Sequence, residues 1–367
     1  MSTATDLYAL NLAEATSLVR YSGETTVLVQ GHMGTGKSSM LKILAQDLPT
    51  HTACYFDCTT KDLGDITIPN VVNLTDSLTD SFVRYVTNEE LGAHLGKPII
   101  LMIDEYGKAN PAVKNALLRL MLERKIGSYT LHPASIVFAT TNLGSEGVGD
   151  LLPAHARNRL TVVKMRKPTN VEWIEEFAIN SGIDHTMIAW VQDNPQLFAT
   201  FEDIKDPQDN KFIFHPADPS RVSFVTPRSL EKASNWLKIR DKLTDKVLMS
   251  ALMGTIGNEA AANLNAFVRV ADQLPSLDSI KKDPMGAVVP SSASAVCMVV
   301  YRTLSTIDKT WMDAWMDYAS RLDKEAQTMF AMQVRRPTYG KQAEVVTNKK
   351  FTQWCMANNY VFAADKK

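Results

Sequence analysis

The stretch TTVLVQGHMGTGKSSMLKIL, Thr25–Leu44, decides the fold of this chain. It begins with an apolar, β-branched run at 26–29, continues as Gly31-x-x-x-x-Gly36-Lys37-Ser38 and ends in an amphipathic segment. This order of strand, glycine-rich loop and helix is the one that the Walker A phosphate-binding pattern requires. A glycine-rich turn that binds nothing is the alternative, but the flanking strand and helix patterns argue against it. The sequence therefore predicts binding of a nucleoside triphosphate.

The residues of this loop suit a triphosphate. Its glycines let the backbone wrap closely around phosphate oxygens, so that successive N–H groups and the helix N-terminus point inward. Lys37 can reach the β- and γ-phosphates, and the Ser38 hydroxyl can ligate Mg²⁺. We therefore predict ATP and Mg²⁺ as cofactors. Nine residues are expected to contact the nucleotide: Gly31, His32, Met33, Gly34, Thr35, Gly36, Lys37, Ser38 and Ser39.

The composition is that of a globular protein with more than one module. A chain of 367 residues is too long for one ordinary core, so two or three modules are expected. The formal net charge of −1 offers no global attraction to nucleic acid. The N-terminus lacks a basic-then-apolar leader, and no window approaches about 18 uninterrupted apolar residues. We therefore expect a cytoplasmic protein without a membrane segment.

The four cysteines predict no metal site. Cys54, Cys58, Cys297 and Cys355 lack the paired CxxC spacing of zinc ligands. Cys54 and Cys58 accompany a strand pattern, which favours buried thiols. Such thiols fit a reducing compartment.

Strand and helix patterns alternate over about residues 24–166. After the first strand, apolar runs recur at 53–57, 97–103, 135–141 and 160–165. The run at 99–103 shows no alternation, which predicts a strand buried on both faces inside a parallel sheet. We therefore predict an α/β fold, a doubly wound parallel sheet with helices on both faces.

Other segments of this region are expected to form helices or loops. A helix is expected at 5–20, where Tyr21-Ser22-Gly23 ends it, and another at 111–124. Residues 59–75 are turn-rich, and their apolar pattern is interrupted, so we interpret them as an insertion. The second helix has an apolar face made by Val113, Leu117, Leu120 and Met121.

Beyond Pro168 the strand pattern fades and helices dominate. Helices are expected at 171–180, 184–192, 229–241, 244–275 and 292–335, with a loop at 203–224 that contains a brief strand at 212–214. Residues 276–292 resemble a linker. These patterns predict three domains, at 1–166, 167–275 and 276–367. A stripe in the last domain is interpreted as core or as a docking surface: Trp311, Trp315, Tyr318, Leu322 and Met329.

Polar residues follow two of the buried runs. Asp104-Glu105 after the run at 99–103 is the Walker B arrangement, in which Asp104 holds Mg²⁺ and Glu105 polarises the attacking water. A surface carboxylate pair is the alternative, but the Walker A segment upstream argues against it. Asn142 ends the next run, where its amide can hydrogen-bond the attacking water and the γ-phosphate. An Asn in that place can also be a simple turn former.

The order of these motifs resembles that of the AAA+ ATPases. The segments GHMGTGKS, IILMIDE, ATTN, LLPAHARNRL and TPRSLEKA follow one another over about residues 20–240. The stretch IDEYGKANPAVKNALLRLMLERKIGSYTLHPASIVFATTN is similar to the MoxR branch in particular. The resemblance implies an AAA+ P-loop fold with a helical lid over 167–275, and a C-terminal extension at 276–367 that it does not explain. It also implies ATP hydrolysis in a ring, usually a hexamer, with ATP at subunit interfaces.

Two arginines acquire roles through this resemblance. Arg159 matches the arginine finger that a neighbouring subunit offers to the γ-phosphate, with Arg157 as a candidate helper. Asn158 stands where the family more often has Asp, and a surface salt bridge is the alternative role for Arg159. Arg228 matches the sensor 2 arginine of the lid.

The sequence around Arg228 predicts a helix start. Thr226 is a plausible N-cap and Pro227 a first-turn residue. The backbone N–H groups of such a helix start add to the guanidinium in contacting an anion.

The resemblance places the working surfaces in two insertions, 60–75 and the hairpin KIGSYTL at Lys125–Leu131. Both could instead be connecting loops, although loops on a rigid scaffold commonly carry function. MoxR-like ATPases commonly work with a separate von Willebrand factor A domain protein. The metal site of such a partner can accept an acidic ligand, so Asp62 or Asp65 could complete the coordination of the cation bound there. Lys125 and Tyr129 are further candidates to contact the partner.

We therefore interpret the chain as an ATP-driven remodelling motor or chaperone of MoxR type that acts on a protein client. A nucleic-acid motor or loader on the same core is the main alternative. It would need a basic stripe with interleaved aromatic residues, whereas pairs such as Arg335-Arg336 and Lys349-Lys350 are scattered. A small-molecule P-loop kinase and a non-hydrolysing scaffold are further alternatives, and the intact Glu105 argues against the scaffold.

Overall fold

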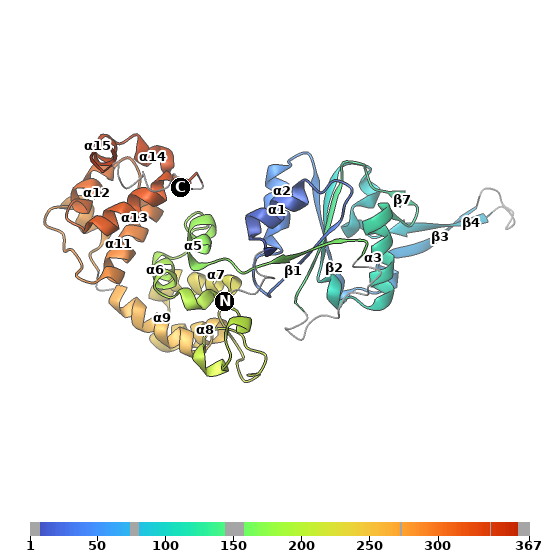
Figure 1. Cartoon of the computed structure of the whole chain (residues 1–367), viewed down its shortest axis with the longest axis horizontal. Coiled ribbons are helices and arrows are strands. Elements are labelled where there is room, and N and C mark those ends of the chain that lie inside the picture. Colours follow the sequence, from blue (N-terminus) through green and yellow to red (C-terminus); the bar gives the residue numbers. More distant parts are fainter. Residues whose placement is uncertain (1–7, 74–80, 144–157, 272–273, 338, 359–367) are drawn as a thin grey trace. The chain divides into compact units, whose positions relative to one another are not determined.

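The computed structural model describes residues 8–73, 81–143, 158–271, 274–337 and 339–358. The chain divides into two compact units, at 1–167 and 168–367 (Figure 1). The first unit contains every strand of the described chain, and the second is helical.

A five-stranded parallel sheet forms the centre of the first unit, in the order β2–β5–β8–β1–β9. Strands β5 and β8 are buried along their whole length, which explains apolar sequences without alternation. The predicted α/β fold and its five strands are confirmed. The strands are β1 (Val27–Gly31), β2 (Thr52–Asp57), β5 (Ile99–Asp104), β8 (Ile136–Thr141) and β9 (Thr161–Met165).

Helices cover both faces of this sheet (Figure 1). Val27 and Val29 pack with α1 (Leu12–Arg20) and α2 (Ser39–Asp47) in one hydrophobic cluster. Leu28, between them in sequence, belongs to a second cluster with α3 (Pro111–Glu123). Successive residues of β1 thus serve opposite cores, as the period of two in a strand requires. The predicted apolar face of the helix at 111–124 is confirmed.

Helix α1 begins later than the predicted segment 5–20, because Asn11 caps it. The Asn11 side chain accepts a hydrogen bond from the Glu14 N–H, and the Glu14 carboxylate accepts one from the Asn11 N–H. Just before this cap, Leu10 pairs with the edge strand β9 through its N–H to the Lys164 carbonyl at 2.9 Å. Residues 5–7 lie outside the described residues. The helix ends at Tyr21, as predicted.

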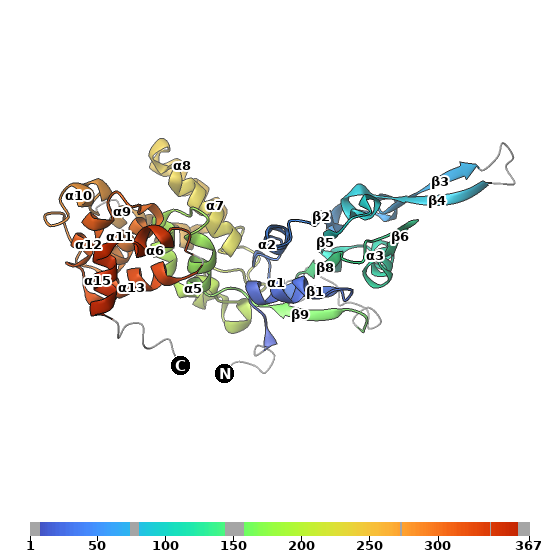
Figure 2. The ribbon, with the colours of Figure 1, turned by 90° about the horizontal axis from the view of Figure 1, so that it is seen from above.

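The predicted insertion at 59–75 contains a strand that the sequence analysis missed. Strand β3 (Thr67–Asn73) pairs antiparallel with β4 (Ser81–Thr87), and the two-stranded ribbon extends away from the sheet (Figure 2). The interpretation as a turn-rich insertion therefore did not include this strand. Apolar side chains are exposed on both faces of the ribbon, so no alternation marked the strands: Ile68, Val71, Phe82, Val83 and Tyr85. Residues 74 and 75 lie outside the described residues.

A second hairpin is hydrogen-bonded to strand β4 of this ribbon. Strands β6 (Lys125–Ile126) and β7 (Tyr129–Thr130) form it within the predicted range 125–131. Ser128 donates its N–H to the Tyr85 carbonyl at 3.0 Å, and its hydroxyl accepts the Tyr85 N–H at 3.2 Å. A Cβ at Gly127 would lie 2.6 Å from the Tyr85 carbonyl oxygen, so the close approach requires glycine.

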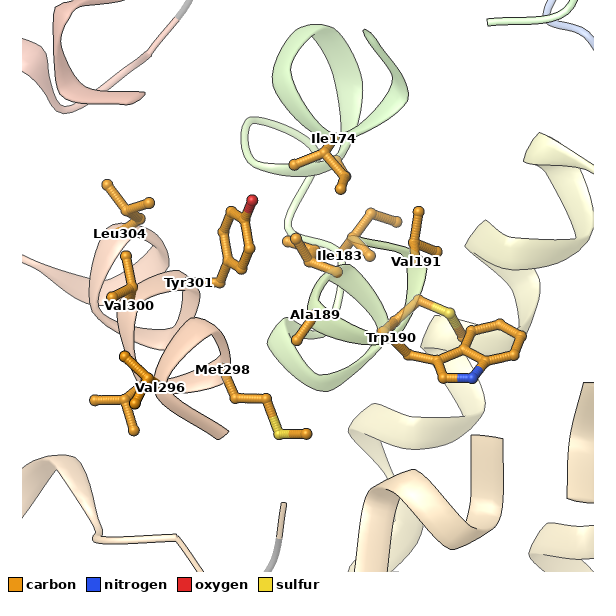
Figure 3. Close-up of a cluster of buried hydrophobic side chains, with 14 of the residues drawn as sticks. Ile174, Ile183, Ala189, Trp190, Val191, Val296, Met298, Val300, Tyr301 and Leu304 are labelled. Atoms are coloured by element: carbon orange, nitrogen blue, oxygen red, sulfur yellow. The ribbon is translucent and has the colours of Figure 1, made fainter. Parts of the chain in front are cut away.

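The second unit packs around one hydrophobic core that extends from Trp173 to Phe351. Figure 3 shows side chains of α6, among them Trp190, opposite side chains of α11, among them Tyr301. The helices are α5 (Asn170–Glu172) with a π-helical turn at Trp173–Ala178, α6 (His185–Asp193), α7 (Pro227–Lys238), α8 (Asp245–Ile256), α9 (Asn258–Ala271), α10 (Leu277–Lys282), α11 (Ala293–Thr306), α12 (Met312–Ala319), α13 (Lys324–Arg335), α14 (Gln342–Val346) and α15 (Lys349–Ala357).

Four predictions for this unit need correction. The helix expected at 244–275 breaks at Gly257, whose φ is +87°, and the one at 292–335 is three helices. The expected linker at 276–292 contains α10, and the brief strand at 212–214 is a single bridge from Ile213 to Val225. Residues on both sides of 276 share the core, and their division into lid and extension stays a prediction.

The aromatic stripe of the last helices is core. Trp311, Trp315, Tyr318 and Leu322 are buried, and Met329 packs against them partly buried. Cys54 and Cys58 are buried free thiols, as predicted, and burial raises the pKa of Cys58 to about 12. None of the helices in the described segments combines the length and apolar character needed to cross a bilayer.

Candidate functional site

The phosphate-binding loop joins the carboxyl end of β1 to α2. Gly34 and Gly36 have φ of +72° and +96°, which only glycine adopts without strain. A Cβ at Gly31 would lie 2.8 Å from the Met165 carbonyl oxygen, so the neighbouring strand also requires glycine there. The Thr35 hydroxyl donates to the His32 carbonyl at 2.9 Å and closes the loop on itself. The sequence thus specifies the loop through both its dihedral angles and its packing.

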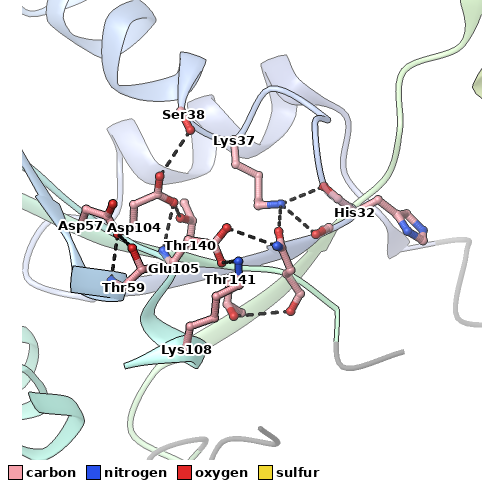
Figure 4. Close-up of polar contacts among 12 residues, drawn as sticks. His32, Lys37, Ser38, Asp57, Thr59, Asp104, Glu105, Lys108, Thr140 and Thr141 are labelled. Carbon is pink, nitrogen blue, oxygen red and sulfur yellow. Dashed lines mark hydrogen bonds and ion pairs between the residues drawn. The ribbon is translucent and has the colours of Figure 1, made fainter. Parts of the chain in front are cut away.

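Lys37 is buried in this loop and reaches the end of the neighbouring strand. Its ammonium donates to the carbonyls of Gly31 and His32 and to the side-chain oxygen of Asn142, each at 2.8 Å (Figure 4). Only 7% of the Lys37 surface is exposed, and these hydrogen bonds compensate for the cost of removing the ammonium from water. The structure therefore brings Lys37 and Asn142 together, although 105 residues separate them.

Asp104, the last residue of β5, is held by its neighbours on both sides. The Thr140 hydroxyl from β8 and the Glu105 N–H donate to Oδ1, the latter at 3.0 Å. The Tyr55 hydroxyl from β2 donates to Oδ2 at 2.9 Å, and Ser38 Oγ lies 3.4 Å from the same oxygen. Asp104 is thus the point where the sheet meets the start of α2 (Figure 4).

Glu105 follows in a strained conformation, with a φ of +54° that few residues other than glycine adopt. Its Oε1 accepts the side-chain N–H of Asn142 at 3.2 Å, and its Oε2 pairs with Lys108 at 3.1 Å. Backbone strain of this kind persists where the surroundings hold it, and it clusters at functional sites. Lys37, Asn142 and Glu105 therefore form one connected polar chain.

Three residues of this cluster were not predicted from the sequence: Tyr55, Lys108 and Thr140. Their signals were weak, because Tyr55 belongs to a short run and Lys108 to a turn. Thr140 lies two residues before Asn142, and the strand register would have placed it beside Asp104. Burial and the neighbouring carboxylate raise the pKa of Tyr55, so its phenol stays protonated and donates.

Arg159 lies away from the polar cluster that contains Lys37, Glu105 and Asn142 of the same chain. It is exposed and precedes β9, whose first residue, Thr161, is in register with Val27 at the start of β1. Because the strands are parallel, Arg159 lies at the amino end of the sheet, opposite the phosphate loop. Arg157 lies outside the described residues.

Arg228 belongs to the helical unit, at the start of α7. Thr226 caps this helix by accepting the Ser229 N–H at 3.0 Å, and Pro227 occupies the first turn, as predicted. Arg228 lines an open hollow of about 650 Å³ together with Lys232 and Trp236. Leu230 and Leu237, on the opposite face of α7, are fully buried. The helix thus presents Arg228 on its exposed face.

The residues present fit a nucleotide with Mg²⁺. A hydroxyl (Ser38) and a carboxylate (Asp104) converge, and such oxygen donors suit Mg²⁺, which commonly takes one or two carboxylates and completes its shell with phosphates and water. The described residues contain no cluster of three or more His, Cys, Asp or Glu side chains that could hold a metal alone. A cation here would therefore depend on the phosphates for the rest of its shell.

The chain is similar to a known family over part of its length and to solved structures at low sequence identity. The family model of the ATPase family associated with various cellular activities (AAA) matches residues 27–166. The Holliday junction branch migration motor RuvB of Thermotoga maritima is 17% identical, with 85% of this chain and 89% of that chain covered and a TM-score of 0.34. A Cytophaga hutchinsonii protein provisionally described as an ATPase is 13% identical, with coverage of 72% and 91% and a TM-score of 0.33.

A search among curated proteins finds no match to the sequence. The identification therefore depends on the family model and on the motifs that the structure brings together. Over residues 27–166, this chain carries a domain of the AAA ATPase family.

Proposed function

We propose that this chain is an ATP-hydrolysing AAA+ motor of MoxR type that remodels a protein client. The observation that carries the hydrolytic part of the proposal is the polar chain at the carboxyl edge of the sheet, and the MoxR type and the client rest on the sequence resemblance. Lys37, Asn142 and Glu105 are linked there by hydrogen bonds of 2.8 and 3.2 Å. A cation, an amide and a carboxylate in this order suit a γ-phosphate and the water that attacks it.

Each residue has a distinct task in this proposal. The loop 31–39 wraps the phosphates with its N–H groups, and Lys37 places its charge against them. Ser38 and Asp104 would hold Mg²⁺, which would supply positive charge against the phosphate oxygens. Glu105 accepts the proton of the attacking water, and Asn142 holds Oε1 of Glu105 in place.

The Lys108 ion pair bears on the position of Glu105. The Lys108 ammonium lies 3.1 Å from Oε2, and the Asn142 amide donates to Oε1, so the carboxylate is held from both sides. Lys108 belongs to the turn that follows Glu105. Movement of this turn would therefore reposition the carboxylate, which offers a way to couple hydrolysis to movement.

The ring is proposed because of Arg159. Its position at the amino end of the sheet, opposite the loop of its own chain, suits a residue that acts on a neighbouring subunit. We propose a hexameric ring, as the resemblance implies, in which Arg159 is the finger and Arg228 is the sensor 2 arginine of the lid at 167–275. Arg157 remains a candidate helper.

The partner is the most specific part of the proposal. We propose a von Willebrand factor A domain protein that meets the insertion at 60–75 or the hairpin at 125–131. The extension of the ribbon away from the sheet and its exposed apolar side chains support a contact role for this region.

Turnover and binding of the Glu105→Gln variant test the hydrolytic proposal. We expect ATP binding to survive while turnover falls by about 10² to 10⁴, because only the general base is lost. Glu123→Gln is the matched control, since Glu123 is an exposed carboxylate on α3 that pairs with Arg119. Equal turnover of Glu105→Gln and wild type would overturn the proposal.

A further inference from the structure

The carboxylate of Asp104 is fixed from three directions. Sheet order places β2 on one side of β5 and β8 on the other. Thr140 of β8 and the Glu105 N–H both donate to Oδ1. Tyr55 of β2 donates to Oδ2 at 2.9 Å. The two carboxylate oxygens are therefore held by different strands.

Oδ2 is the oxygen that faces the phosphate loop. Ser38 Oγ lies 3.4 Å from it, which is long for a hydrogen bond between a hydroxyl and a carboxylate. Of these two hydroxyls, that of Tyr55 thus makes the shorter hydrogen bond to Oδ2. Without it, the carboxylate would be fixed through Oδ1 only.

The packing of Tyr55 does not by itself explain the residue. Its side chain is 45% exposed, whereas the next residue, Phe56, is fully buried in the core. A ring at position 55 therefore contributes little to the core, and the distinguishing feature of Tyr55 is where its hydroxyl points. This feature is absent from the Walker patterns, which do not extend to β2.

We propose that Tyr55 is a positioning residue for the Mg²⁺ site, where its hydroxyl orients the Asp104 carboxylate toward Ser38 and strengthens Mg²⁺ binding. The inference rests on the proposed function and deepens it. Groups that hydrogen-bond to metal ligands commonly change metal affinity by about 10-fold to 100-fold when they are removed. Tyr55 donates to Asp104 and is not itself a ligand, so the lower end of that range is expected.

Tyr55→Phe tests this role, because it keeps the ring and removes only the hydroxyl. The affinity of a fluorescent ATP analogue is measured over a series of free Mg²⁺ concentrations and again in EDTA. We expect the Mg²⁺ concentration for half-maximal gain in affinity to rise about 10-fold. The affinity in EDTA should equal that of wild type, because Tyr55 acts through Asp104.

Tyr85→Phe is the matched control. Tyr85 is 48% exposed and lies on the ribbon, so loss of its hydroxyl should leave the Mg²⁺ series unchanged. Thermal unfolding of all three proteins checks that they are equally folded.

Two results would overturn the inference alone. One is a Tyr55→Phe series that superimposes on that of wild type. The other is an equal loss of affinity with Mg²⁺ and in EDTA, which would show a direct contact with the nucleotide. A wild-type protein that gains no nucleotide affinity from Mg²⁺ would overturn the proposed Mg²⁺-ATP site together with the inference.

Discussion

The carboxyl edge of the sheet and the β3–β4 ribbon belong to the same unit but are fixed in different ways. At the edge, Lys37 and Asp104 are less than 9% exposed, and several hydrogen bonds hold each side chain. On the ribbon, Val71 and Val83 pair across the strands and are 63% and 51% exposed. The edge resembles a site with prearranged geometry, and the ribbon resembles a surface that another molecule covers.

Under the proposed function, this difference would let one domain separate two tasks. A reaction centre must hold polar groups in one arrangement, which requires burial and complete hydrogen bonding. A contact surface needs exposed apolar area, which costs little in stability as long as the strands stay paired. Substitutions at the edge should therefore change chemistry or stability, and substitutions on the ribbon should change contacts.

Arg159→Ala should have the largest effect of the variants that leave the edge intact. If Arg159 completes the edge of a neighbouring subunit, ATP binding should persist while turnover falls by about 10³, because a finger stabilises only the transition state. Arg119→Ala, on α3, is the exposed control and should retain full activity.

Mixing Arg159→Ala subunits with Glu105→Gln subunits sharpens this test. Some interfaces would then hold both an intact base and an intact finger, so partial activity should return. Wild-type specific activity should also fall on dilution. Activity that is independent of concentration, with no recovery on mixing, would remove Arg159 from the mechanism.

Thr140→Val measures how much a hydrogen bond at the edge contributes to stability, for comparison with a substitution on the ribbon. Thr140 is fully buried and donates to the Asp104 carboxylate, so the near-isosteric change removes one hydrogen bond to a charged group. We expect a loss of about 1–3 kcal/mol and a melting transition several degrees lower in scanning calorimetry. An unchanged transition would mean that the bond does not contribute to stability.

Val83→Ser on the ribbon should change stability by less than about 0.5 kcal/mol, because the side chain is already half exposed. Basal ATPase activity should remain at the wild-type level. A large loss of either would show that the ribbon is part of the folded core, and the contrast between the two regions would fail.

Charge reversal at Asp62 tests the proposed partner contact without touching the edge. Asp62→Lys should abolish capture of a von Willebrand factor A domain protein from native lysate, as EDTA should, while basal ATPase activity survives. Asp65 is the second position proposed for this contact, and its carboxylate accepts the Asp62 N–H at 2.8 Å. Asp241→Lys, in the helical unit, is the control. If the partner is still captured after charge reversal at Asp62 and in the presence of EDTA, metal-bridged docking is excluded.

The sequence predicted the sheet because its strands have strong local signals, and it singled out most of the residues that the structure brings together at the carboxyl edge. A glycine-rich loop after a strand, and carboxylates after an apolar run, specify position as well as chemistry. Asn142 and Lys37 could be assigned to one site because parallel strands bring their carboxyl ends to one edge. Roles for Arg159 and Arg228 came from the resemblance and remain predictions.

What the sequence did not reveal depends on pairing between distant segments. Strand β3 is stabilised by β4, and neither buries a face, so the alternation that marks a half-buried strand is missing. Tyr55 and Thr140 act through the register of β2 and β8 against β5, which no single segment contains. The break at Gly257 was the exception, since a glycine with positive φ could have been anticipated there.

Calorimetric titration of Mg²⁺-ATP into wild type and Lys37→Ala tests the central claim most directly. The account predicts that wild type binds one nucleotide per chain and that the variant loses most of its affinity, because Lys37 is the cation that the loop offers to the phosphates. Lys114→Ala, a lysine on α3, should bind as wild type does. Equal affinity of Lys37→Ala and wild type would contradict the claim that the carboxyl edge of this sheet is an ATP site.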